Sequence, residues 1–120
     1  MGCQSPTPPT KAPAAYDQLV REAIAQAQAR PDTAFFWFTN TGTERARSLM
    51  LDVGVDYLRY DRGADVLCVW TGEWIRPALG YATAPTANQI PVDSLSGLCN
   101  LEGTCSVTSV TEAWSRFRCE

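Results

Sequence analysis

The stretch VDYLRYDRGADVLCVWT, residues 55–71, decides the fold of this chain. Val55–Tyr60 and Ala64–Thr71 both have the residue types of β-strands, and the second run is heavily apolar. Between them, Asp61-Arg62-Gly63 supplies residues that favour a tight turn. Two such runs joined by a short turn predict an antiparallel β-hairpin.

A helix is predicted on the N-terminal side of this hairpin, over residues 14–30. Pro13 precedes it and Pro31 ends it. One stripe of apolar side chains recurs at helical spacing and faces the core, formed by Tyr16, Leu19, Val20, Ala23, Ile24 and Ala27. The continuous run Ala34–Phe38 then predicts a central strand that is covered on both faces.

Two further segments complete the predicted fold. Residues 44–55 fit a helix that begins at a capping box between Thr41 and Glu44, and they also fit a strand. We favour a strand from about Leu49, because the alternation is long and includes Gly54. The last strand is expected over Cys105–Cys119, interrupted near residues 111–113. The predicted class is α+β, with the N-terminal helix packed on a mostly antiparallel, disulfide-stabilised sheet.

The composition narrows the possible functions. The chain has 120 residues and a formal net charge of −3, so we expect no nucleic-acid partner. It contains no histidine, which removes histidine metal sites and histidine-based catalytic triads. No apolar stretch is long enough for a membrane-spanning helix. We expect no metal and no cofactor, and one domain over residues 14–120 behind a flexible tail, residues 1–13.

The five cysteines indicate an oxidising compartment. If Cys3 is set aside, four remain, and four cysteines allow three disulfide connectivities. Cys99 and Cys105 flank a short turn-like segment, so we predict that they pair with each other and that Cys68 pairs with Cys119. The alternatives are free thiols in a cytosolic protein and, less favoured by the spacing, a zinc site.

The N-terminus resembles the mature end of a bacterial lipoprotein. The residues that carry the resemblance are Gly2-Cys3 and the Pro/Ser/Thr-rich run over residues 4–10. The resemblance implies that Cys3 is acylated and that the domain lies in the periplasm or cell envelope, with Gln4 favouring the outer membrane. The hydrophobic stretch expected before the cysteine is missing, so Met1 would be an added start. Two alternatives are an N-myristoylated start with a palmitoylated Cys3, from whose pattern Pro6 departs, and an ordinary disordered start.

A loop over residues 71–85 is the predicted protein-binding surface. It combines aromatic and arginine side chains with Gly and Pro, and such side chains are frequent anchors of interfaces; they are Trp74, Ile75, Arg76, Leu79 and Tyr81. The alternative is that Trp74 and Tyr81 fold back and cover the sheet. Arg116 and Arg118 alternate with Phe117 and Cys119, which predicts an outward-facing edge with modest positive charge.

The carboxylates give only a weak catalytic signal. Asp52 and Asp56 would share a strand face but stand about 13 Å apart along it, farther than a glycosidase pair requires. Asp61 and Asp65 flank a turn, where aspartate commonly caps local backbone groups. No EF-hand-like loop is present, and Cys99 and Cys105 lack the CxxC spacing of a redox pair.

These observations predict a non-enzymatic, lipid-anchored cell-envelope protein that binds another protein as an accessory subunit of a membrane-associated assembly. A periplasmic inhibitor or immunity-type binding protein is a close alternative. A small secreted hydrolase that uses Asp52, Asp56 and Glu73 belongs to a different class, as does a soluble virion or assembly component without lipid.

Overall fold

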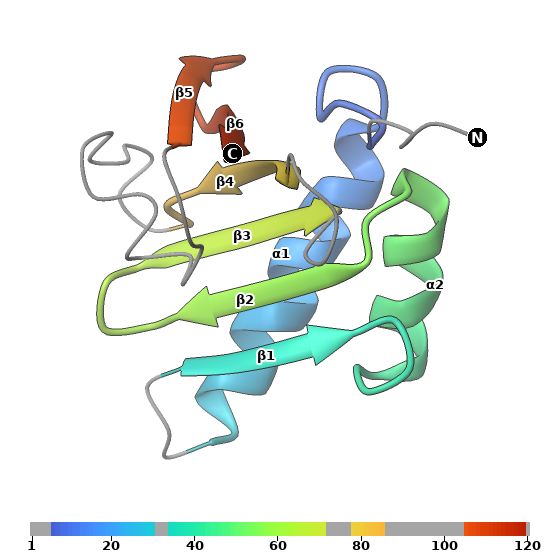
Figure 1. The fold of residues 1–120 in the computed structure, drawn as a ribbon. Helices are drawn as coiled ribbons and strands as arrows, with labels where there is room; N and C mark the ends of the chain where they lie inside the picture. The colour runs from blue at the N-terminus through green and yellow to red at the C-terminus, as the bar shows by residue number, and fades with distance from the viewer. Residues whose placement is uncertain (1–5, 31–33, 72–77, 86–104, 120) are drawn as a thin grey trace.

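The computed structural model describes residues 6–30, 34–71, 78–85 and 105–119. Two helices lie on one face of a six-stranded antiparallel sheet with the strand order β1-β2-β3-β4-β6-β5 (Figure 1). This confirms the predicted α+β class. None of the described helices has both the length and the apolar character needed to cross a bilayer. The elements are α1 (Pro13–Gln28), β1 (Ala34–Phe38), α2 (Glu44–Val53), β2 (Tyr57–Asp61), β3 (Val66–Thr71), β4 (Ala78–Thr83), β5 (Cys105–Ser109) and β6 (Trp114–Cys119).

The predicted hairpin is confirmed as β2 and β3. Tyr57 lies opposite Trp70 in the register, and Asp61 lies opposite Val66. The Ala64 N–H donates to Asp61 Oδ1 at 3.0 Å, and Asp65 adopts a positive φ of 56°. The two aspartates therefore serve the turn, as aspartate commonly does where the chain reverses.

Strand β1 was predicted to be central, but it lies at one edge of the sheet and pairs only with β2 among the described strands. Phe35 and Trp37 are buried under the helices, while Phe36 and Phe38 join an aromatic group on the opposite face. A run that is apolar at every position shows that both faces of a strand are used. It does not distinguish a central strand from an edge strand.

The favoured strand over residues 49–55 is also wrong, because residues 44–53 form helix α2. Its N-cap is Thr43, whose Oγ1 accepts from the Ala46 N–H at 3.1 Å. Gly54 ends the helix in the left-handed region with a φ of 75°, a conformation that glycine adopts without steric cost. The buried side chains follow helical spacing, and they are Ala46, Leu49, Met50 and Val53.

The C-terminal strand is interrupted as predicted, and the interruption is a turn that creates a second hairpin. Thr111 Oγ1 accepts from the N–H groups of Ala113 and Trp114, at 3.1 and 3.0 Å. Strand β6 then returns between β4 and β5. Strand β5 therefore forms the other edge of the sheet.

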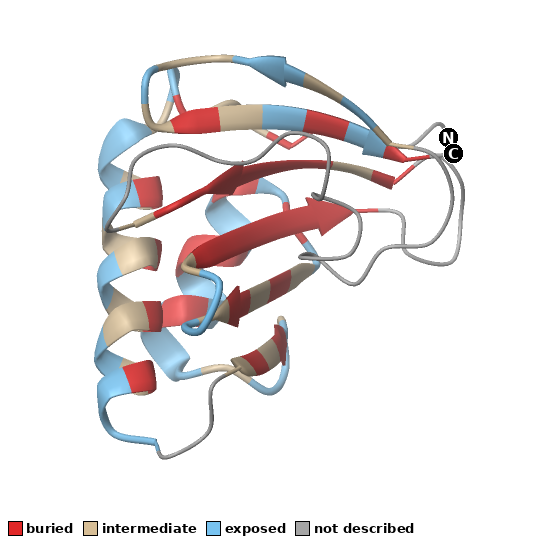
Figure 2. Cartoon of the chain, turned by 90° about the vertical axis from the view of Figure 1, so that its left-hand side faces the viewer, coloured by how far each residue is buried: buried red, intermediate tan, exposed pale blue. Residues whose placement is uncertain are grey.

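Helix α1 is held on the sheet by Tyr16, which is fully buried. Its ring makes edge-on contacts with Trp114 at 5.0 Å and with Tyr81 at 6.0 Å between centroids. Figure 2 shows the buried positions of the helix turned toward the sheet and its exposed positions turned outward. The predicted apolar stripe is thus the side of α1 that packs on the core.

The N-terminal segment makes contact with the domain before α1 begins. The Thr7 N–H donates to Val53 O at 2.8 Å, and the Tyr16 hydroxyl donates to Thr7 O at 2.5 Å. Pro6 and Pro9 are buried. Residues 6–12 therefore belong to the surface of the domain and are not the flexible tail predicted for them.

Candidate protein-binding surface

An aromatic row crosses the sheet on the face opposite the two helices, called here the second face. The strand register aligns Phe38, Tyr57, Trp70, Gly80, Phe117 and Val107 across all six strands. Side chains at cross-strand positions point to the same face and interact directly. The row therefore links the β1 edge to the β5 edge.

At the β1 end, four rings form one cluster. Tyr57 stacks on Trp70 with centroids 5.6 Å apart and planes 28° apart, and Phe38 meets Tyr57 at 5.5 Å. Phe36 joins them from the neighbouring row, at 4.9 Å from Phe38 and 5.7 Å from Trp70. Such ring pairs contribute about 0.5–1.5 kcal/mol beyond the area that they bury.

Exposure rises along this cluster toward the edge. Trp70 is 2% exposed, Tyr57 and Phe36 are half-buried, and Phe38 is 41% exposed. Besides Phe38, only Leu51 is an exposed large apolar side chain among the described residues. Phe38 is therefore a ring that rests on a rigid aromatic base and offers much of its surface to a partner.

Trp70 adds a polar feature to the base of the cluster. Its indole Nε1 is buried and has no hydrogen-bond partner among the residues that the structure describes. A buried donor without a partner costs about 1–3 kcal/mol. Because Trp70 stacks on Tyr57, this donor lies within the same cluster of rings as the exposed Phe38.

Gly80 makes the middle of the row possible. A Cβ at this position would lie 2.1 Å from Val69 O and 2.6 Å from both Trp70 Cβ and the Phe117 ring. The absence of a side chain lets the large rings of Trp70 and Phe117 approach the same point from both sides. The sequence pattern gave no sign of this role.

In the described part of the chain, few charges lie near the aromatic cluster on the second face. Arg59 and Asp61 form an ion pair with a 3.8 Å N–O distance, and they lie opposite Phe36 and Ala34 in the register. This pair is partly exposed, so it contributes little to stability. It leaves the region beside β1 close to electrically neutral.

Three tyrosines on the helix face of the sheet and on α1 have altered acidity. Burial raises the pKa of the Tyr16, Tyr60 and Tyr81 hydroxyls, because ionisation would place a charge in a poorly solvated site. The carboxylate of Asp65, which accepts a hydrogen bond from the Tyr60 hydroxyl at 3.4 Å, raises the pKa of Tyr60 further. All three hydroxyls stay neutral at physiological pH, and those of Tyr16 and Tyr60 donate hydrogen bonds to Thr7 O and Asp65 Oδ1.

The binding loop predicted over residues 71–85 is only partly described. Trp74, Ile75 and Arg76 lie outside the described residues, and their role stays a prediction. Leu79 and Tyr81 lie on strand β4 and not in a loop. Tyr81 is 6% exposed and packs against Tyr16, as the alternative of a covering role anticipated.

Leu79 lines a shallow hollow of about 150 Å³ together with Pro6, Pro8, Gly80, Tyr81 and Arg116. Arg116 and Arg118 are exposed on β6, whereas Phe117 and Cys119 are fully buried. This confirms the predicted outward-facing arginines. The strand that carries them lies one position inside the sheet edge.

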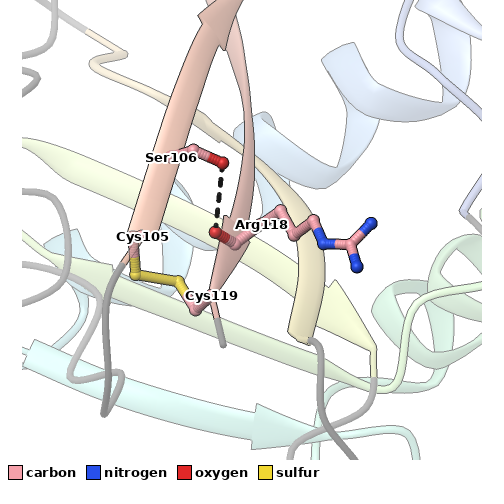
Figure 3. Close-up of a disulfide and its surroundings, with 4 residues drawn as sticks. All are labelled: Cys105, Ser106, Arg118 and Cys119. Carbon is pink, nitrogen blue, oxygen red and sulfur yellow. Dashed lines mark hydrogen bonds between the residues drawn. A yellow bond between two sulfur atoms is a disulfide. The ribbon is translucent and has the colours of Figure 1, made fainter.

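The disulfide pairing differs from the prediction. Cys105 and Cys119 are bonded to each other across β5 and β6, with Cα atoms 4.0 Å apart (Figure 3). The predicted Cys99–Cys105 and Cys68–Cys119 pairs are therefore both wrong. Closeness in sequence suggested a small ring, but the hairpin register places Cys105 directly opposite Cys119. Cys68 is also disulfide-bonded, and its partner lies outside the described residues, where Cys3 and Cys99 fall.

The carboxylates named for hydrolysis are not gathered into a site by the described part of the chain. Asp52 is exposed on α2, Asp56 is exposed just before β2, and Glu73 lies outside the described residues. The described ranges contain no group of three or more Cys, Asp or Glu side chains placed to hold a metal ion.

The aromatic row was missed in the sequence. The turn predicted over residues 61–63 would place Tyr57 opposite Leu67, whereas the observed turn between Asp61 and Val66 shifts the register and places Tyr57 opposite Trp70. The pairing of β1 with β2 could not be predicted either, because a continuous apolar run indicates only that both faces of a strand are used.

Comparison with known protein families, curated proteins and solved structures finds no match to this chain.

Proposed function

We propose that this protein is a non-enzymatic, lipid-anchored cell-envelope protein that binds another protein as an accessory subunit of a membrane-associated assembly. The observation that carries the binding role is the graded exposure of the aromatic cluster, from Trp70 at 2% to Phe38 at 41%. Aromatic side chains on a rigid, water-excluding base are the usual energetic centre of protein interfaces. We infer that Phe38 is the anchor of this contact and that Tyr57 and Phe36 surround it.

The anchor in this proposal is acylated Cys3. Two or more acyl chains hold a domain stably at a bilayer, whereas a single chain binds only reversibly. Cys3 precedes the buried Pro6 by three residues, and each residue spans at most about 3.8 Å. The lipid would therefore hold the domain within about 11 Å of the bilayer surface, which raises its local concentration near membrane partners.

The lipid proposal has a consequence for the disulfides. Acylation requires the Cys3 sulfur to be free of a disulfide, so Cys68 must pair with Cys99. Peptide mapping of unreduced protein from its native host tests both points together. We expect an acylated N-terminal cysteine and a Cys68–Cys99 bond. A Cys3–Cys68 bond, or an unmodified Cys3 thiol in the native protein, would contradict the anchor and leave the binding role to be judged separately.

The binding role is tested with a pair of exposed apolar residues. Phe38→Ser removes the proposed anchor, and Leu51→Ser removes a side chain that is 68% exposed on α2. Each variant is expressed in the native host, cross-linked, and purified from membranes for quantitative mass spectrometry. We expect the co-purified partner to fall at least about tenfold with Phe38→Ser, the effect of losing one interface hot spot, and to stay unchanged with Leu51→Ser. Equal recovery with both variants would reject this surface.

A further inference from the structure

Strand β1 leaves backbone hydrogen-bonding groups at the edge of the sheet. The Phe38 N–H donates to Thr41 Oγ1 at 2.8 Å, and the Phe38 C=O accepts from the N–H groups of Thr41 and Gly42 at 3.3 Å each. The backbone of Phe38 is therefore turned away from β2 and toward the following turn. Successive residues of an antiparallel strand direct their backbone groups to alternate sides. Phe36 and Ala34 thus direct their N–H and C=O groups toward the edge.

Within the described ranges, this edge has none of the usual protections against pairing with another strand. Natural edges carry lysine, proline, a bulge or a covering element. The sequence of β1, AFFWF, contains no charge and no proline, and no described strand lies beyond it (Figure 1). The other edge, β5, also contains no charge and no proline, but its exposed side chains are polar and belong to Ser106, Thr108 and Ser109.

We propose that β1 pairs antiparallel with β1 of a second copy of this chain, around a two-fold axis at Phe35. In this register Ala34 of one copy lies opposite Phe36 of the other, so that both edge-directed residues form hydrogen-bonded pairs. On the second face a small side chain meets each large ring, and on the helix face the two Phe35 rings meet at the axis. A symmetric contact of this kind closes on itself and does not continue into a fibre.

On the second face, the charges beside β1 fit this pairing, because Arg59 and Asp61, which lie opposite Phe36 and Ala34 in the register, neutralise each other within one copy. On the helix face, Arg30 lies over the Phe35 ring, 5.7 Å from its centroid, so the axis at Phe35 brings two guanidinium groups toward each other. This repulsion weakens the dimer and makes it tighter at high salt. Phe38 lies beyond the paired residues and stays available. The dimer does not depend on the lipid anchor or on a different partner, and it would present two Phe38 anchors on one continuous sheet.

In this register only residues 34–36 of the five-residue strand β1 face their counterparts in the other copy, so the dimer should be weak. Contacts below about 1,200 Å² belong to the transient class of interfaces. We expect a dissociation constant on the order of 10–100 µM, which attachment to a membrane would offset by raising the local concentration.

Sedimentation equilibrium of the oxidised Cys3→Ser protein, from about 1 to about 500 µM, tests the dimer without acyl chains or Cys3 disulfides. Ala34→Pro removes an N–H that faces the edge, at the first position of a strand, where proline is tolerated. Ser109→Pro is the matched change on β5. The Val110 N–H bonds to Trp114 O on β6, so the Ser109 N–H faces the other edge.

We expect a concentration-dependent dimer that Ala34→Pro weakens at least about tenfold and Ser109→Pro leaves unchanged. Hydrogen exchange of the unsubstituted edge gives a second readout that does not depend on how well a variant folds. The Phe36 amide should exchange more slowly at high than at low protein concentration. A monomer at all concentrations, a dimer equally affected by both prolines, or a Phe36 amide insensitive to concentration would overturn the proposal.

Discussion

The two edges of the sheet are built in different ways. Strand β5 is polar along its exposed side and is bonded covalently to β6 by the Cys105–Cys119 disulfide. Strand β1 is apolar throughout and pairs with β2 by backbone hydrogen bonds, with aromatic rings on both faces. The β5 edge therefore presents polar side chains on a covalently fixed strand, whereas the β1 edge presents the apolar surface that a protein partner could use.

The comparison also separates stability from recognition. The aromatic row joins the two edges, but its buried centre at Trp70, Gly80 and Phe117 lies between them. We therefore expect changes at the centre to unfold the protein, changes at the β5 edge to loosen it locally, and changes at the β1 end to alter binding.

The largest effect is expected at Gly80, where the row depends on the absence of a side chain. Gly80→Ala would place a Cβ 2.1 Å from a backbone oxygen of the neighbouring strand, and neither strand can move without breaking the register. We expect a loss of about 3 kcal/mol or more in the free energy of unfolding, measured by urea denaturation. Gly63→Ala, in the exposed turn between β2 and β3, is the control and should cost far less. Equal stability of the two variants would show that the row tolerates a side chain at its centre.

The next largest loss of stability is expected at the β5 edge, which the Cys105–Cys119 disulfide links to β6. The double variant Cys105→Ala with Cys119→Ala removes a disulfide that spans 14 residues. The loop-entropy model assigns such a link about 3 kcal/mol. Hydrogen exchange should rise in β5 and its turn while β1 keeps its protection, because the two strands lie at opposite edges of the sheet. A uniform rise across the sheet would show that the edges are not independent.

The sequence predicted the parts of the fold that depend on local patterns. The stripe on α1, the hairpin turn at Asp61 and the break before Trp114 each have a signal within a few residues. The position of β1 and the Cys105–Cys119 bond depend on which strands meet, and no local signal records this. The strand predicted from Leu49 was wrong for a different reason. Gly54 fits the interior of a strand by sequence pattern, but in the structure it ends helix α2 at a positive φ.

The candidate site shows the same division. Arg116 and Arg118 were correctly placed on the surface from strand alternation alone. Tyr81 was expected in a binding loop but is buried beneath α1, because its strand lies in the middle of the sheet. Phe38 could be identified as an exposed anchor only once β1 was known to be an edge strand.

Alkaline pH should destabilise the side of the sheet covered by the helices. The pKa values of Tyr16, Tyr60 and Tyr81 are raised in the folded state by burial, so above the unfolded pKa of about 10 only the unfolded state ionises readily. Stability is therefore complete below about pH 10 and falls as the pH rises toward the folded values.

Tyr16→Phe separates the hydrogen bond from this titration. It removes the hydroxyl that bonds to Thr7 O and should cost about 1.5 kcal/mol at neutral pH, while making the alkaline loss shallower. Urea denaturation at pH 7 and at about pH 11 measures both effects. An unchanged alkaline slope would mean that Tyr16 does not carry the pH dependence.

The smallest effect on stability is expected at the two ends of the aromatic row. Substitutions there best distinguish a role in binding from a role in stability. Phe38→Ser at the β1 end and Val107→Ser at the β5 end each remove a side chain that is already partly in solvent, so each should cost under about 1 kcal/mol in urea denaturation. Recovery of the membrane partner should fall with Phe38→Ser alone, because only that end has a ring exposed on an aromatic base. If Phe38→Ser instead costs as much as Gly80→Ala, Phe38 is part of the core. The asymmetry between the edges would then reflect stability and not recognition.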